Sequence, residues 1–126
     1  MRSFPAGYGG RFVLRDDWES SQAALLRVEA RHEGVEAIIT VEGELDHSTV
    51  ERFVARILEA LDTKPRSITV DAPAVTFTDS SGLSALLQAR GLAFVDHVAF
   101  RIRDPSPRLR RPVEASGIED LPLPDE

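Results

Sequence analysis

The sequence predicts one α/β sandwich, in which about three helices pack on a mixed sheet of four or five strands. The 126 residues suit a single domain. Two runs rich in strand-forming residues, separated by the turn sequence His32-Glu33-Gly34, indicate an N-terminal β-hairpin. Helical and strand patterns alternate after this hairpin, which is typical of helices laid on a mostly parallel sheet.

The hairpin pairs a predicted strand over residues 24–31 with one over residues 35–41, and Gly43-Glu44-Leu45-Asp46 ends the second strand. A helix follows, because apolar residues recur with the spacing of one buried face. These residues are Val50, Phe53, Val54, Ile57, Leu58 and Leu61. Asp46 or Ser48 is the expected cap of this helix, and Ser48 stands three residues before Glu51, as in a capping box.

Pro65 stops this helix, and residues 66–71 form the next predicted strand. A strand that is reached through a helix pairs in parallel with the strand before that helix. A second helix is predicted over residues 84–92, with one common face formed by Leu83, Leu86, Leu87 and Arg90. Residues 97–103 alternate as a further core strand.

The last predicted helix begins at the cap Ser106, with Pro107 in its first helical position. Three apolar residues of this region are expected to face inward: Leu109, Val113 and Ile118. Pro112 removes a backbone hydrogen bond, so the helix is expected to be short or kinked, and Gly117 ends it. A short strand near residues 121–123 would make the sheet five-stranded.

Composition excludes several classes of protein. A net charge of −6 argues against broad binding to nucleic acid or to anionic lipid. The absence of cysteine excludes disulfides, thiolate metal sites and a cysteine nucleophile. No apolar run is long enough to span a bilayer, and the N-terminus does not resemble a signal peptide, so we expect a cytoplasmic protein.

No pattern in the chain indicates an enzyme. The three histidines, His32, His47 and His97, are too few and too scattered for a metal site. No P-loop, dinucleotide fingerprint or nucleophile elbow is present. We therefore assign no catalytic residue, no metal ligand and no cofactor.

Charge is distributed unevenly along the chain. Residues 29–62 are strongly acidic, whereas residues 101–111 carry a group of arginines, Arg101, Arg103, Arg108, Arg110 and Arg111. This arginine group is either ordinary solvated surface or part of a polarised surface that orients a protein partner.

The segment Phe77-Thr78-Asp79-Ser80-Ser81-Gly82 carries the strongest functional pattern. Asp79 or Ser80 would cap the following helix, which is also an ordinary structural role. Gly82 costs about 0.5–1 kcal/mol relative to alanine in a helix, so we expect a close approach of another backbone or of a ligand there. A phosphate on Ser80 or Ser81 would be stabilised by the free N–H groups and the dipole of the helix. The residues alone leave both interpretations open.

Three segments together resemble the bacterial anti-sigma factor antagonists: Gly43-Glu44-Leu45-Asp46, Phe77 to Leu83, and Pro105-Ser106-Pro107-Arg108-Leu109-Arg110-Arg111. The domain of these proteins is the STAS domain, which the cytoplasmic ends of sulfate transporters share. The resemblance covers about residues 24–121. It implies a STAS-like sandwich, which we assign to residues 23–126. Residues 1–22 show no periodicity and are not matched by the family, so we expect them to form a flexible N-terminal extension.

The resemblance implies a specific function. Members of this family bind an anti-sigma factor with serine-kinase activity and so release its sigma factor. The kinase phosphorylates the first serine of Asp-Ser-Ser-Gly, and a protein serine phosphatase reverses this step. Carried over, Ser80 is the phosphorylation site. The implied partner-binding residues are Asp46, His47, Asp79, Ser80, Ser81, Gly82 and Ser84, with no direct contact to nucleic acid or membrane.

An alternative within the same family is a STAS scaffold subunit that assembles into a larger signalling or transport complex without releasing a sigma factor. In either case we expect Gly82 to be small for contact reasons, with an ordinary negative φ. Gly82→Ala is then expected to leave stability unchanged or slightly raised and to weaken partner binding.

Overall fold

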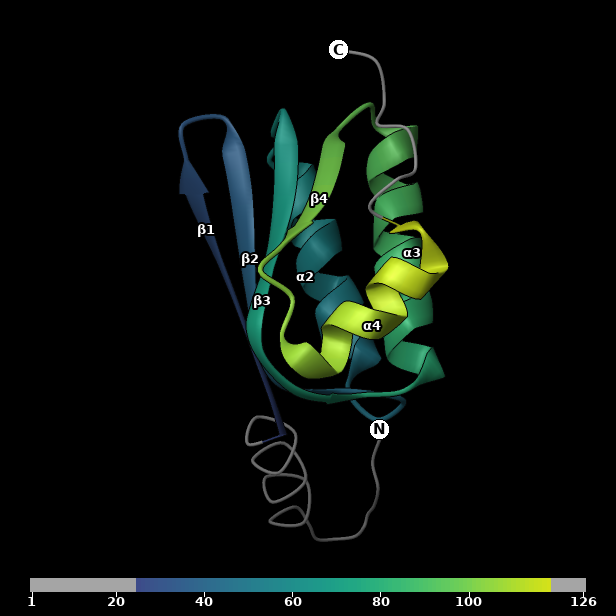
Figure 1. Cartoon of the computed structure of the whole chain (residues 1–126). Helices are drawn as coiled ribbons and strands as arrows, with labels where there is room; N and C mark the ends of the chain where they lie inside the picture. The colour runs from purple at the N-terminus through teal and green to yellow at the C-terminus, as the bar shows by residue number, and fades with distance from the viewer. Residues whose placement is uncertain (1–24, 119–126) are drawn as a thin grey trace, which may run out of the picture.

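Four strands form one mixed sheet in the order β1-β2-β3-β4 (Figure 1). The computed structural model describes residues 25–118. The strands are β1 (Leu26–Glu33), β2 (Glu36–Leu45), β3 (Ser67–Thr78) and β4 (Ala99–Arg103). β1 and β2 pair antiparallel as a hairpin, and β3 and β4 join in parallel, as the sequence predicts.

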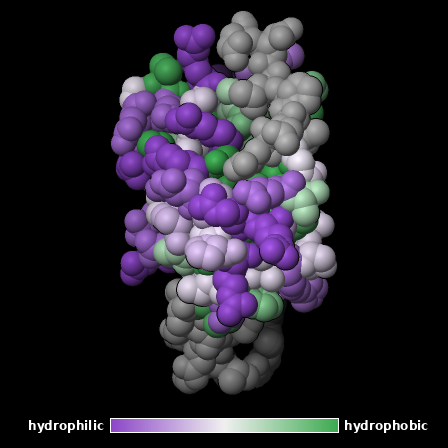
Figure 2. All heavy atoms as spheres, in the orientation of Figure 1, coloured by the Kyte–Doolittle hydropathy of each residue, from purple (hydrophilic) through white to green (hydrophobic). Residues whose placement is uncertain are grey.

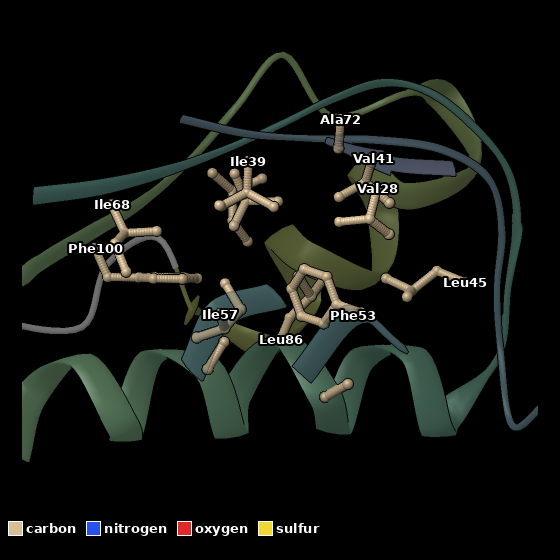
Figure 3. Close-up of a cluster of buried hydrophobic side chains, with 14 of the residues drawn as sticks. Val28, Ile39, Val41, Leu45, Phe53, Ile57, Ile68, Ala72, Leu86 and Phe100 are labelled. Atoms are coloured by element: carbon tan, nitrogen blue, oxygen red, sulfur yellow. The ribbon is translucent and has the colours of Figure 1, made fainter. Parts of the chain in front are cut away.

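Three helices alternate with the last strands and lie on one side of the sheet (Figure 1). They are α2 (Val50–Asp62), α3 (Ser80–Val95) and α4 (Pro107–Ser116). The core lies between the two layers: Ile39 and Val41 project from the sheet toward Phe53 of α2 and Leu86 of α3 (Figure 3). All four side chains are fully buried. The predicted α/β fold and element order are confirmed.

β3 is longer than predicted and carries the chain to the start of the candidate motif. It runs through Thr78, whereas the sequence predicts a strand only as far as residue 71. Its pairing with β2 shifts register between Thr40 and Glu42 and again between Gly43 and Glu44. Proline has no N–H to donate to a neighbouring strand, which explains why Pro73 falls in the first of these irregular stretches.

α3 begins four residues earlier than predicted, at Ser80. The predicted common face is wrong, because Leu87 is 40% exposed. The buried positions of α3 are instead mostly small: Gly82, Ala85, Leu86, Ala89 and Ala93. These small side chains allow the helix to pack closely on its neighbours, and the larger apolar residues other than Leu86 remain partly exposed.

The predicted cap of α2 is also wrong. Thr49 occupies the N-cap position, and its side chain caps no helix N–H. The buried Thr49 hydroxyl accepts a hydrogen bond from the Asp46 N–H at 3.0 Å and donates one to the Glu44 carbonyl at 2.7 Å. The Ser48 hydroxyl donates to the Asp46 carboxylate at 2.8 Å, so the predicted capping box with Glu51 does not form.

The last helix matches its prediction closely. The Ser106 hydroxyl accepts a hydrogen bond from the Leu109 N–H, and Gly117 ends α4 in the left-handed conformation. Leu109, Val113 and Ile118 are buried, as predicted. α4 continues past Pro112 to Ser116, so the proline does not shorten it.

The predicted extension over residues 1–22 and the predicted strand near residues 121–123 lie outside the described residues. None of the helices between residues 25 and 118 is long and apolar enough to cross a membrane.

Candidate functional site

The candidate residues meet where β2 and β3 end and α3 begins. Leu45 and Thr78, the last residues of the two strands, are register partners. The Thr78 hydroxyl donates a hydrogen bond to the Leu45 carbonyl at 2.9 Å. The loop at residues 46–49 follows Leu45, and α3 follows Thr78 after one residue, so this pairing brings the two predicted segments together.

Asp79 joins the two segments. It is the N-cap of α3, and its Oδ1 accepts a hydrogen bond from the Gly82 N–H at 3.0 Å. Its Oδ2 accepts one from the His47 N–H at 3.3 Å, which reaches across to the loop after β2. Burial of the carboxyl group would by itself raise its pKa, but hydrogen bonds from the backbone N–H groups of Gly82, His47 and Ser81 outweigh burial, and the pKa of Asp79 lies below its ordinary value.

Gly82 faces the end of β2. A Cβ at this position would lie 2.2 Å from the Leu45 carbonyl oxygen and 2.2 Å from the Thr78 hydroxyl oxygen. Its φ lies outside the left-handed region, so the expectation of a contact reason is confirmed. The contact is made within the chain, however, and the expectation that alanine is tolerated without loss of stability is wrong, because a backbone oxygen occupies the space.

Asp46 organises the loop that follows β2. Its Oδ1 accepts hydrogen bonds from the N–H of Ser48 at 3.0 Å and from the Ser48 hydroxyl at 2.8 Å. The neighbouring His47 is exposed and contributes its backbone N–H to Asp79. The predicted pair Asp46 and His47 is thus held against the start of α3.

Ser80, Ser81 and Ser84 lie on the outer side of this junction. Ser80 and Ser84 are exposed and Ser81 is half-buried. All three line a groove of about 480 Å³ between α2 and α3. The groove is lined by Val50, Glu51, Val54, Ala55 and Leu58 of α2 and by Ser80, Ser81, Ser84, Ala85 and Gln88 of α3. Leu58, predicted to face the core, is 48% exposed beside this groove.

Two residues hold the site together in roles that the sequence does not predict. Thr49 fixes the loop through its buried hydroxyl, and Thr78 holds the end of β3 to the end of β2. A threonine directly before a helix is a signal for the N-cap position, which Thr49 occupies, but this signal does not predict that its hydroxyl bonds the Glu44 carbonyl. Nothing in the sequence shows which carbonyl the Thr78 hydroxyl reaches, because Leu45 is 33 residues away.

The arginine group does not form one free basic surface. Arg101 hydrogen-bonds to the Thr69 hydroxyl at 2.9 Å and pairs with Glu36 at 3.3 Å. Arg103 pairs with Asp71 at 3.3 Å, and Arg110 donates to the Pro105 carbonyl. Arg103 therefore pairs with the neighbouring strand β3, and the Arg101 side chain reaches across β3 to Glu36 of β2.

A comparison with protein-family models decides the family. The model described as Mlab, STAS domain matches residues 28–124, which is most of the chain. The chain belongs to the STAS domain family. A search of curated proteins found no significant match.

Solved structures of this family resemble the chain closely. The anti-sigma factor antagonist SpoIIAA in its unphosphorylated form is 29% identical, with a TM-score of 0.59 over 75% of this chain and 84% of SpoIIAA. An antagonist STAS domain from Rhodobacter sphaeroides is 26% identical, with a TM-score of 0.57 over 69% of this chain and 98% of that domain. An antagonist from Mycobacterium paratuberculosis shares the fold at 21% identity, with a TM-score of 0.65 over 75% of this chain and 80% of that one.

The STAS domain described here is therefore similar to anti-sigma factor antagonists. Within residues 25–118, no cluster of three or more His, Asp or Glu side chains could hold a metal ion. The exposed serines and the groove are the distinctive features of the site.

Gly82→Ala is predicted to destabilise the protein by about 1–3 kcal/mol, because its Cβ would overlap the Leu45 carbonyl. Gly91→Ala in the same helix is the matched control, since a Cβ there has nothing within 4 Å. It should be neutral or stabilising by up to about 1 kcal/mol. Urea unfolding of both variants checks the difference, and equal effects would contradict the close approach.

Asp79→Ala is predicted to lower stability at pH 7 by about 1 kcal/mol, because α3 loses its cap. The folded pKa of Asp79 is lowered, so its contribution is complete above the unfolded value of about 3.9 and is lost as pH falls through the folded value. The difference in the free energy of unfolding between wild type and Asp79→Ala should therefore become smaller below about pH 4. Asp79→Asn keeps a capping side chain without the charge and serves as the control. Urea unfolding measured from pH 7 to 3 checks this prediction. A stability difference that stays the same over this range would contradict the role of the Asp79 carboxylate.

Proposed function

We propose that this chain is an anti-sigma factor antagonist that works by partner switching. Unmodified, it binds an anti-sigma factor with serine-kinase activity, which then releases its sigma factor. Phosphorylation of Ser80 by that kinase ends the binding, and a protein serine phosphatase restores it. The observation that carries the proposal is an exposed Ser80 at the first position of α3, directly beside the groove between α2 and α3.

The position of Ser80 suits a phosphorylated residue. The side chain is exposed, so a kinase can reach its hydroxyl without unfolding the domain. The dipole of a helix stabilises an anion at its N-terminal end by about 0.3–1 kcal/mol. SpoIIAA from Bacillus, 29% identical to this chain, has been solved in a phosphorylated form, which supports phosphorylation as a property of this chain too.

The groove suits a protein partner. Val54 and Leu58 offer apolar surface on α2, and the α3 side is lined by small serine and alanine side chains. An apolar side chain of the partner can therefore lie between the helices while its polar groups reach Ser80 and Ser84 at the edge. This surface is continuous with the junction formed by Asp46, His47 and Asp79.

A phosphate on Ser80 would act through charge in this proposal. It adds about −1.5 to −2 charges beside Asp79 and the groove residue Glu51. A partner surface packed against Ser80 would then cover an unpaired dianion, and like-charge contacts at an interface cost several kcal/mol. This cost exceeds the roughly 0.3–1 kcal/mol gained at the helix end, so binding is lost while the fold persists.

A second candidate function is a scaffold subunit, because the matching family model is described as Mlab, STAS domain and not as an antagonist. The two candidates differ in their partner. Affinity capture from lysate, read by mass spectrometry, should recover a soluble kinase-type anti-sigma factor if the chain is an antagonist. Recovery of a membrane or multi-subunit complex, with no such kinase, would favour the scaffold.

Ser80→Asp is predicted to keep the wild-type circular dichroism and melting temperature within a few degrees but to lose at least about tenfold in affinity for the captured kinase, about 1.4 kcal/mol. Ser80→Asn, similar in size but uncharged, is the control that isolates charge and should bind better than Ser80→Asp. Isothermal titration calorimetry measures both.

Ser80→Ala should retain partner binding and abolish phosphorylation by the kinase, whereas Ser81→Ala should still be phosphorylated. Mass spectrometry of the treated proteins locates the phosphate. Modification of Ser81, Ser84 or Ser106 in the wild-type chain would refute the assignment to Ser80.

A further inference from the structure

β1 is an outer strand of the sheet formed by the described residues. Within residues 25–118 no strand lies beyond it. Glu33 and Glu36 are register partners that flank a two-residue turn, so the odd-numbered residues of β1 exchange hydrogen bonds with β2. The backbone N–H and C=O groups of Val28, Ala30 and His32 then point outward. The Leu26 carbonyl accepts a hydrogen bond from the Arg52 guanidinium. This agrees with the alternation, because Leu26 is also an even-numbered residue.

The side chains of β1 alternate between the two faces of the sheet, and those of the odd-numbered residues 27–33 are charged. Leu26 and Val28 are buried in the core, so the odd-numbered residues lie on the other face of the sheet. There Arg27, Glu29, Arg31 and Glu33 form a row of alternating sign, with side chains 53–70% exposed. In the view of Figure 2 the surface along this edge is predominantly hydrophilic. Charged rows usually protect an edge strand from pairing with other chains.

This row is complementary to itself. If two copies pair antiparallel about Ala30, Arg27 lies opposite Glu33 of the second copy, and Glu29 lies opposite its Arg31. A shift of two residues in either direction places glutamate opposite glutamate and arginine opposite arginine. Opposite charges directly across two strands are favourable and like charges are unfavourable, so one register is selected.

We propose that β1 is a self-recognition edge, through which two copies of this chain form a two-fold dimer with their β1 strands antiparallel about Ala30. The same register brings the outward backbone groups of Val28, Ala30 and His32 into position for about six hydrogen bonds between the strands. An added strand of this kind is a common mode of protein association. The two sheets would form one continuous eight-stranded sheet.

The dimer leaves the candidate site accessible. The edge is formed by the outer side of β1, away from α3 (Figure 1). The groove lies between α2 and α3. A pair of short strands is smaller than a standard interface, so we expect a reversible dimer with a dissociation constant on the order of 10 μM. The proposal does not depend on the function proposed above.

A charge-exchange experiment on the full chain tests the proposal by sedimentation equilibrium over about 1–500 μM. One variant combines Arg27→Glu with Arg31→Glu, and the other combines Glu29→Arg with Glu33→Arg. Each variant alone presents like charges across the two-fold axis and should weaken the dimer at least about tenfold. An equimolar mixture of the two should form a heterodimer of roughly wild-type affinity. A variant with all four exchanges should dimerise again.

All four positions are exposed, so circular dichroism should show each variant folded. Wild-type protein that remains monomeric at about 500 μM would overturn the proposal. Dimers of unchanged affinity in both charge variants, or no recovery in the mixture, would also overturn it.

A cross-link tests the register directly. Paired residues at the axis have Cα atoms about 5.5 Å apart, which a disulfide can bridge. The chain has no cysteine, so Ala30→Cys introduces a single thiol that should form a covalent dimer under mild oxidation. Arg108→Cys places an exposed thiol on α4 as the control and should cross-link much more slowly. Equal rates would overturn the register.

Discussion

The carbonyl group of Leu45 is the point on which the site depends. The Leu45 carbonyl accepts a hydrogen bond from the Thr78 hydroxyl. Gly82 approaches the same carbonyl so closely that no side chain fits at residue 82. The ends of two parallel strands and the first turn of α3 therefore meet at one backbone oxygen. Asp79 reinforces this junction, because it caps α3 and accepts the N–H of His47 from the opposing loop.

This junction explains why Ser80 can be exposed without being loosely held. The residues on either side of it are fixed by the Asp79 cap and by the contact of Gly82 with β2. Its own side chain lies at the edge of the groove, where it contributes to a surface rather than to the core. A modification there changes the charge of the surface with little need for the core to move.

The sequence predicted the fold well where local chemistry decides the structure. The cap Ser106 and the terminator Gly117 act within one helix, and both are found where predicted. The buried face of α3 was missed because hydrophobicity favours leucine, whereas close packing on the sheet selected alanine and glycine. Periodicity alone cannot show how near two elements approach each other.

In the candidate site, too, local features can be predicted from the sequence, whereas contacts between distant segments cannot. Asp79 as a cap and Gly82 as a point of close approach follow from their places in the first turn of a helix. The partner of Gly82 does not follow, because the Leu45 carbonyl belongs to a strand 37 residues earlier and is brought there only by the parallel pairing of β2 and β3. For this reason the sequence alone does not reveal the cost of alanine at residue 82.

The central claim is that phosphate on Ser80 alters a surface and leaves the fold unchanged. Hydrogen–deuterium exchange of the free protein, with and without phosphate on Ser80, tests it most directly. The account predicts changes only around residues 43–48 and 78–85, the two segments that meet at the Leu45 carbonyl. Changes that extend through the core to β4 would show that phosphate acts by reshaping the domain and would contradict the account.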